Sequence, residues 1–115
     1  MSEKNVIKRK IYRLLRIMLE EKGINIYKII FFGSFAKNTQ RKDSDIDIII
    51  VSKDFRNKNI FERIEYTIGI NRKLVRQFKK PFDIIYYSDE EWEKGNSLLI
   101  HSAKIEGEVI YSSVF

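Results

Sequence analysis

Two short apolar runs, separated by a glycine turn and an acidic pair, limit the folds that this chain can adopt. The first run, residues 27–32, ends at Gly33, and the second, residues 45–51, begins with the acidic pair. Both are rich in β-branched or aromatic residues, which is typical of strands. Because only about ten residues connect them, the two strands are predicted to be antiparallel neighbours in one sheet.

The rest of the chain alternates between helical and strand patterns. Helical spacing of apolar residues predicts helices over residues 2–22 and 59–79, and a capping-box pair, Ser88 with Glu91, predicts a last helix through residue 103. Residues 82–87 read as a third strand after Pro81, and residues 109–111 as a short edge strand. We therefore expect an α/β (α+β) fold, a small mixed sheet covered by helices, in a single domain over residues 1–115.

The predicted topology brings three acidic residues to one edge of the sheet. Asp45 and Asp47 are two residues apart on a strand, so their side chains share a face, with Cα atoms about 6.6 Å apart. The long helical segment between the second and third strands favours a parallel crossover. The start of the third strand, which carries Asp83, is then expected at the same edge.

Gathered carboxylates need a neutralising partner. Two of them about 4 Å apart repel by about 4 kcal/mol at an effective dielectric constant of about 20, and a divalent cation relieves that repulsion. Oxygen ligands, with waters and phosphates in the remaining positions, suit magnesium. Gly33 permits close backbone approach to an anion, and Ser34 adds a hydroxyl donor. The alternatives are ion pairs of Asp45 and Asp47 with Arg41 or Lys42, and an Asp83 satisfied by backbone amides.

The same residues form a recognisable motif. Gly33-Ser34, ten intervening residues and then Asp45-Ile46-Asp47 within "SDIDIII" resemble the nucleotidyltransferase superfamily that includes DNA polymerase beta, in particular its minimal nucleotidyltransferase (MNT) branch. The third acid of that family corresponds to Asp83 in "KPFDIIYY", and "IHSAKIEGEVIY" is similar to its C-terminal segment. The family usually has Arg-Gly where this chain has Lys37-Asn38, so a phosphate contact there loses the bidentate guanidinium.

The resemblance implies a palm-like fold and Mg²⁺-dependent transfer of a nucleoside monophosphate, with ATP as the expected nucleoside triphosphate. It assigns catalysis and metal binding to Asp45, Asp47 and Asp83, and nucleotide binding to Gly33, Ser34 and Lys37. MNT proteins are paired with helical HEPN proteins, many of them toxins. The resemblance therefore implies an antitoxin that transfers AMP to a hydroxyl of a HEPN-type partner, with a homo-oligomer as another way to complete the acceptor surface.

Two other classes of function stay open from the sequence. One is a catalytically weak or inactive domain that neutralises its partner by binding alone. The other is a basic nucleic-acid-binding module, because the net charge is +6. The basic residues are spread along the chain, which is more typical of a solvated surface than of a nucleic-acid site. With no apolar signal core and no run long enough to cross a bilayer, we expect a cytoplasmic protein with no membrane partner.

Overall fold

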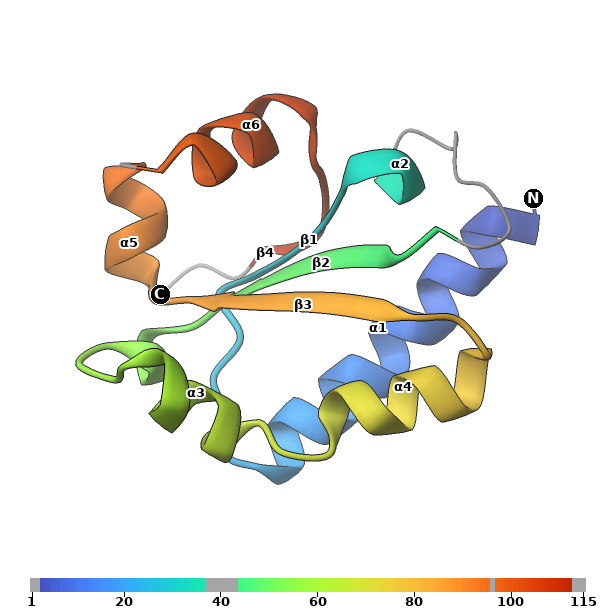
Figure 1. Ribbon diagram of the computed structural model, residues 1–115, viewed down its shortest axis with the longest axis horizontal. Helices are drawn as coiled ribbons and strands as arrows, with labels where there is room; N and C mark the ends of the chain where they lie inside the picture. Colours follow the sequence, from blue (N-terminus) through green and yellow to red (C-terminus); the bar gives the residue numbers. More distant parts are fainter. Residues whose placement is uncertain (1–2, 37–43, 96, 113–115) are drawn as a thin grey trace.

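The computed structural model describes residues 3–36, 44–95 and 97–112 (Figure 1). The longer helices are α1 (Glu3–Glu21), α3 (Ile60–Tyr66), α4 (Ile70–Phe78), α5 (Asp89–Lys94) and α6 (Leu98–Glu106). Two short turns of helix are α2 (Gly33–Ala36) and η1 (Lys53–Phe55). The strands are β1 (Lys28–Phe32), β2 (Ile46–Val51), β3 (Phe82–Tyr87) and β4 (Glu108–Ser112).

The four strands form one mixed sheet in the order β3-β2-β1-β4. Strand β1 pairs antiparallel with both β2 and β4, and β2 pairs parallel with β3. The expected antiparallel pair, the parallel crossover and the C-terminal edge strand are therefore confirmed, and with them the α/β fold. Strand β3 is one edge of the sheet, so in the described part of the chain no strand pairs with its outer side. Helices α3 and α4 lie next to that side (Figure 1).

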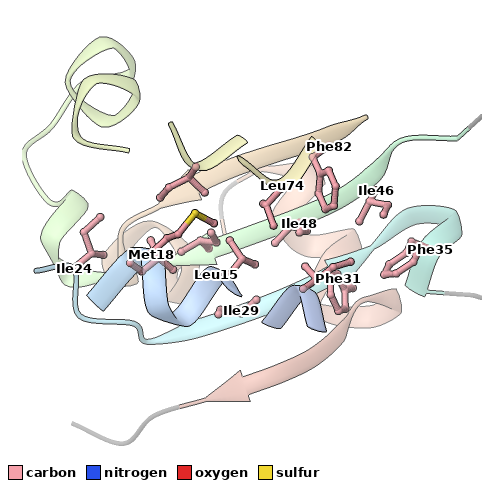
Figure 2. Close-up of a cluster of buried hydrophobic side chains, with 14 of the residues drawn as sticks. Leu15, Met18, Ile24, Ile29, Phe31, Phe35, Ile46, Ile48, Leu74 and Phe82 are labelled. Atoms are coloured by element: carbon pink, nitrogen blue, oxygen red, sulfur yellow. The ribbon is translucent and has the colours of Figure 1, made fainter. Parts of the chain in front are cut away.

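Helices cover both faces of the sheet. Helices α1 and α4 lie on one face, where the alternating side chains of β1 and β2 meet the apolar stripe of α1 (Figure 2). Helices α5 and α6 cover the other face through Trp92, Ile100 and Ala103, which pack with Ile49 and Val51 of β2. Odd-numbered residues of β2 and β3 thus belong to the α5–α6 face, and even-numbered ones to the α1–α4 face.

Two helices that the sequence pattern predicts as continuous are each broken in two. Residues 59–79 form α3 and α4, because the chain turns at Gly69, whose φ is +90°. The last helix divides into α5 and α6 at Gly95, a left-handed C-cap with a φ of +61°. The expectation of a single helix was wrong at Gly69, where the apolar period continues across the glycine but the helical backbone does not. At the second place the break falls at Gly95, the glycine that already weakens the prediction of one continuous helix.

Arg63 of α3 links η1 and α5 to the C-terminal end of β3. Its guanidinium donates to the carbonyl oxygens of Lys58 (2.9 Å), Phe55 (2.9 Å) and Tyr86 (2.8 Å), and lies 2.7 Å from Oε1 of Glu91. Only 14% of the Arg63 side chain is exposed. One side chain therefore joins η1, α3, β3 and α5 at the far end of the sheet from Asp45.

The surface of α4 and the turn after it is strongly basic. Arg72, Lys73, Arg76, Lys79 and Lys80 line shallow hollows there, and residues 69–81 contain no acidic residue. We call these five residues the α4 basic surface. Within the described ranges, no helix is both long enough and apolar enough to cross a lipid bilayer.

Candidate active site

Asp47 and Asp83 lie side by side on neighbouring parallel strands. The register of β2 and β3 pairs Asp47 with Asp83, and the Ile46 amide donates to the Pro81 carbonyl oxygen (2.9 Å) just before this pair. Paired residues of neighbouring strands project to the same face. Both carboxylates therefore belong to the face that α5 and α6 cover, at the end of the sheet that those helices leave open (Figure 1).

Asp45 brings a third negative charge to this end of the sheet. It is exposed and precedes β2 by one residue, whereas Asp47 is half-buried. Burial, and after it the negative charges of Asp83 and Asp45, together raise the pKa of Asp47 from 3.8 to about 6. The direction follows from both causes, because a carboxylate that is partly buried beside other carboxylates is costly to ionise. The structure thus places Asp47 beside Asp83, and Asp45 lies near enough at the same end of the sheet for its charge to act on Asp47.

The glycine turn lies against this acidic group. Phe32, the residue before Gly33, is paired with Asp47 in the β1–β2 register. Gly33 has a φ of +68°, and a Cβ built on it would lie 2.6 Å from Oδ2 of Asp47. A side chain at position 33 would therefore collide with Asp47, so glycine is required both for the backbone conformation and for the close approach.

The other predicted nucleotide-binding residues are less fully described. Ser34 follows Gly33 in the backbone of α2, but its side chain is outside the described part of the structure. Lys37 lies outside the described residues, as do Arg41 and Lys42, the possible ion-pair partners of the acidic pair. The roles of Ser34 and Lys37 remain predictions.

Phe35 and Lys8 hold α2 in place, and the sequence analysis missed both. Phe35 is buried and packs edge-on against Phe31, with ring centroids 4.9 Å apart. The Lys8 ammonium group lies 5.4 Å from the centroid of the Phe35 ring and 3.2 Å from Oε1 of Glu108. The position of Lys8 within the apolar stripe of α1, three residues before Ile11, was the available signal, because an amine on a buried face needs a partner.

The acidic group is left open to a cation. Among the described residues, no arginine, lysine or histidine side chain forms an ion pair with Asp45, Asp47 or Asp83, and no three acidic, histidine or cysteine side chains are grouped closely enough to enclose a metal. An open site of this kind fits magnesium, which keeps waters and phosphate oxygens among its ligands. Asp45, Asp47 and Asp83 have the carboxylate chemistry to hold it.

Comparison with known proteins agrees with this geometry. The family model for the nucleotidyltransferase domain matches residues 11–110. A Methanocaldococcus jannaschii protein, provisionally named a protein adenylyltransferase, is 34% identical over 88 residues. The matched region covers 75% of this chain and 79% of that relative.

Solved structures share the fold. A toxin–antitoxin structure with AMP-PNP has a TM-score of 0.64 at 20% identity, covering 88% of this chain and 73% of that one. A Sulfolobus solfataricus protein provisionally named a nucleotidyltransferase has a TM-score of 0.61 at 19% identity, covering 97% and 90%. A complex of the tri-AMPylated Shewanella oneidensis HEPN toxin with its MNT antitoxin has a TM-score of 0.62 at 20% identity, covering 96% and 73%. The matched domain covers most of the chain, and the chain belongs to the nucleotidyltransferase domain family and is a nucleotidyltransferase.

Proposed function

We propose that this protein transfers AMP from ATP to a hydroxyl group of a partner protein, with magnesium as its cofactor, as the antitoxin of a HEPN/MNT pair. The observation that carries the proposal is the pairing of Asp47 with Asp83 directly opposite the Gly33 turn. This arrangement puts negatively charged oxygen ligands beside a backbone that tolerates close approach of a phosphate. Such a pair of features suits a nucleoside triphosphate with a bound cation.

Each acidic residue has a role that follows from its surroundings. Asp45 and Asp47 would hold magnesium between themselves and the triphosphate, and when bound the cation supplies charge neutralisation for the phosphates. Gly33, Ser34 and Lys37 would contact the β- and γ-phosphates. Asp83 is exposed, so an acceptor can approach it from solvent while Asp47 is partly covered. Asp83 would therefore also accept the proton from the attacking hydroxyl.

The proposed reaction is an in-line displacement at phosphorus. The acceptor oxygen forms a bond to the α-phosphorus of ATP, the bond from that phosphorus to the bridging oxygen breaks, and pyrophosphate leaves with the bonding electrons. The hydroxyl proton passes to the Asp83 carboxylate. Positioning of the acceptor and neutralisation of phosphate charge supply most of the acceleration in reactions of this type.

A protein acceptor and an antitoxin role are supported by the relatives. The Methanocaldococcus jannaschii relative is provisionally named a protein adenylyltransferase, and the Shewanella oneidensis complex contains an AMPylated HEPN toxin beside an MNT antitoxin. In this proposal the residues that bind ATP carry out the AMP transfer, and that transfer inactivates the toxin. Transfer to the partner distinguishes the proposal from neutralisation by binding alone.

The experiment is an intact-mass measurement on a co-purified pair. The protein is incubated with a HEPN-type partner protein in the presence of ATP and magnesium, and the masses of both chains are measured. The expected result is a mass increase of one or more AMP groups on the partner, absent with EDTA or with Asp45→Asn. Partner binding without any mass increase, equal for the wild type and the variant, would instead establish a binding-only antitoxin.

A nucleic-acid ligand is the second candidate, and the α4 basic surface is the observation that favours it. Its five cationic residues lie in a segment, residues 69–81, that contains no acidic residue. Binding of this kind weakens steeply with salt, by about one logarithmic unit of slope for each phosphate contact. A salt-dependent affinity for RNA that Arg72→Glu with Arg76→Glu abolishes, without change in AMP transfer, would assign that surface to nucleic acid.

A further inference from the structure

An apolar groove begins at Asp83 and follows the open edge of β3. It has a volume of about 600 Å³ and is lined on the sheet side by Asp83 through Tyr87. Its outer wall is α3, through Ile60 and Ile64, which are 66% and 56% exposed. Helix α3 has no buried residue, although three of its seven residues, Ile60, Phe61 and Ile64, are large and apolar. We call this feature the β3 groove.

Among the described residues, Ile84 is the place on the outer side of β3 where both the backbone N–H and the C=O have no hydrogen-bond partner. The Pro81 and Tyr87 carbonyl oxygens accept from Ile46 and Ser52 of the β2 side, so odd-numbered β3 residues bond inward. The backbone N–H and C=O groups of the even-numbered residues therefore point away from β2, toward the groove. Of these, Phe82 and Tyr86 have their carbonyl oxygens occupied by Asn71 Nδ2 and Arg63. The N–H and C=O of Ile84 lie between the two occupied carbonyls, at the centre of the groove.

We propose that the β3 groove binds an extended apolar segment of the acceptor protein, which pairs its backbone with Ile84 and presents a hydroxyl side chain to Asp83. The inference rests on the proposed function, since it takes Asp83 as the residue that receives the acceptor. From Asp83 to Tyr87 the strand extends about 13 Å, which accommodates a segment of about five residues. Apolar side chains of the segment pack against Ile60 and Ile64.

The pairing geometry directs the acceptor residue to Asp83. If the segment runs antiparallel to β3, the residue opposite Ile84 exchanges hydrogen bonds with it, and the next residue stands opposite Asp83. That neighbour forms the non-hydrogen-bonded pair, whose side chains approach most closely, with Cα atoms about 4.5 Å apart. Its side chain projects to the same face as the Asp83 carboxylate. A hydroxyl at this position therefore meets the three acidic residues.

The lining of the groove favours a polypeptide over the other occupants. A nucleic acid would be attracted to the α4 basic surface, with its five cations, whereas the groove has two: the Arg63 guanidinium, which is paired with Glu91, and Lys58, whose ammonium group lies over the Tyr66 ring. The phosphates of ATP belong at Gly33, on the opposite side of Asp47 from β3. An exposed apolar surface beside an unpaired strand edge is the usual recognition mode for an extended peptide.

Methyl NMR on isoleucine-labelled protein tests this without any need for catalysis. The probe is a blocked six-residue peptide in which valine alternates with tyrosine, and the comparison probes are the same peptide with aspartate for valine, a six-nucleotide oligouridine and ATP with magnesium. The valine peptide is expected to shift the methyl resonances of Ile60, Ile64 and Ile84 and to leave those of Ile17 and Ile105 unchanged. No shift in the groove overturns the proposal.

Matched variants give the second readout. Ile64→Glu is expected to weaken peptide binding about tenfold or more, whereas Ile17→Glu, at a side chain that is 54% exposed on α1, is expected to leave it unchanged. Groove shifts caused by ATP, by oligouridine or by raising the protein concentration alone would assign the groove to a nucleobase, RNA or a second copy, and would overturn the proposal.

The outcome for the groove is separable from the outcome for the function. If the valine peptide binds in the groove but no acceptor receives AMP, the proposed function fails and the docking site stands. If AMP transfer is intact in Ile64→Glu and the valine peptide binds it as it binds the wild type, the docking inference fails and the proposed function stands.

Discussion

Gly33 approaches Asp47 so closely that a Cβ on the glycine would lie 2.6 Å from Oδ2 of the carboxylate. The glycine turn and the partly buried acid are therefore in direct contact. The contact depends on pairing of Phe32 with Asp47 across β1 and β2, and on Phe35 packing over Phe31. The turn and the acid are therefore parts of one rigid unit, and altering either one is expected to disturb ATP binding.

Gly33→Ala is expected to abolish binding of ATP with magnesium. The methyl group would displace the Asp47 carboxylate, and the positive φ adds a strain of about 1 kcal/mol. Gly23→Ala is the matched control, because Gly23 has a φ of +73° with nothing within 4 Å of a built Cβ. Isothermal titration calorimetry measures ATP binding by both variants, and thermal unfolding measures their stability. Together they separate the effect of the contact with Asp47 from the effect of backbone strain. Equal ATP binding by the two variants would refute the role of the close contact.

Asp47→Asn is expected to stabilise the metal-free protein at neutral pH. The folded pKa of Asp47, about 6, lies above its ordinary value of 3.8, so between these values the folded state binds more protons than the unfolded state. The stability contribution of this group therefore falls as pH rises from about 4 to about 6. An asparagine side chain does not ionise, so the Asp47→Asn variant avoids this loss of stability.

Thermal unfolding in EDTA measures this effect. At about pH 7.5 the melting temperature of Asp47→Asn is expected to exceed that of the wild type by a few degrees, and at about pH 4 the two should converge. Added magnesium should stabilise the wild type at the higher pH and have little effect on the variant. A variant that is less stable than the wild type at about pH 7.5 would mean that the Asp47 carboxylate is favourably paired.

Asp83→Asn is expected to separate ATP binding from transfer. Asp45 and Asp47 remain to hold the cation, so the dissociation constant for ATP with magnesium should change little, while transfer should fall by about 10²–10⁴-fold because the proton acceptor is lost. Calorimetry and intact-mass kinetics on the same preparation measure the two quantities. If ATP binding and AMP transfer are lost together, Asp83 acts mainly as a metal ligand, and its separate role as a general base is refuted.

Arg63→Met is expected to destabilise the fold by about 3 kcal/mol, because it leaves three backbone carbonyl oxygens and the Glu91 carboxylate without their cation. Arg72→Met is the control, since Arg72 lies on the exposed side of α4, and its cost should stay within about 0.5 kcal/mol. Urea unfolding of both variants gives the comparison. Equal stability would show that Arg63 contributes no more than a surface cation.

Much of the fold and the convergence of the acidic residues could be predicted from the sequence. The short link between residues 32 and 45 leaves little choice but antiparallel neighbours, and the long segment before residue 82 favours a parallel return. Strand alternation then places Asp47 and Asp83 on one face. These are local constraints of length and period, which a single sequence carries.

Other features depend on contacts that no local pattern contains. The break at Gly69 was missed because isoleucines at positions 60, 64 and 68 continue a helical period, yet all three are exposed. Arg63 contacts residues of η1, β3 and α5 and of the loop before α3, so its role follows only from the packed structure. The burial that raises the pKa of Asp47 is likewise a property of the assembled sheet.

Calorimetric titration of ATP, with and without magnesium, on the wild type and Asp45→Asn tests the central claim most directly. If the crowded carboxylates are tolerated because they hold a cation for the triphosphate, the wild type will bind ATP only when magnesium is present, and Asp45→Asn will bind it at least tenfold more weakly. Equal binding in EDTA, or unchanged binding by Asp45→Asn, would contradict the account.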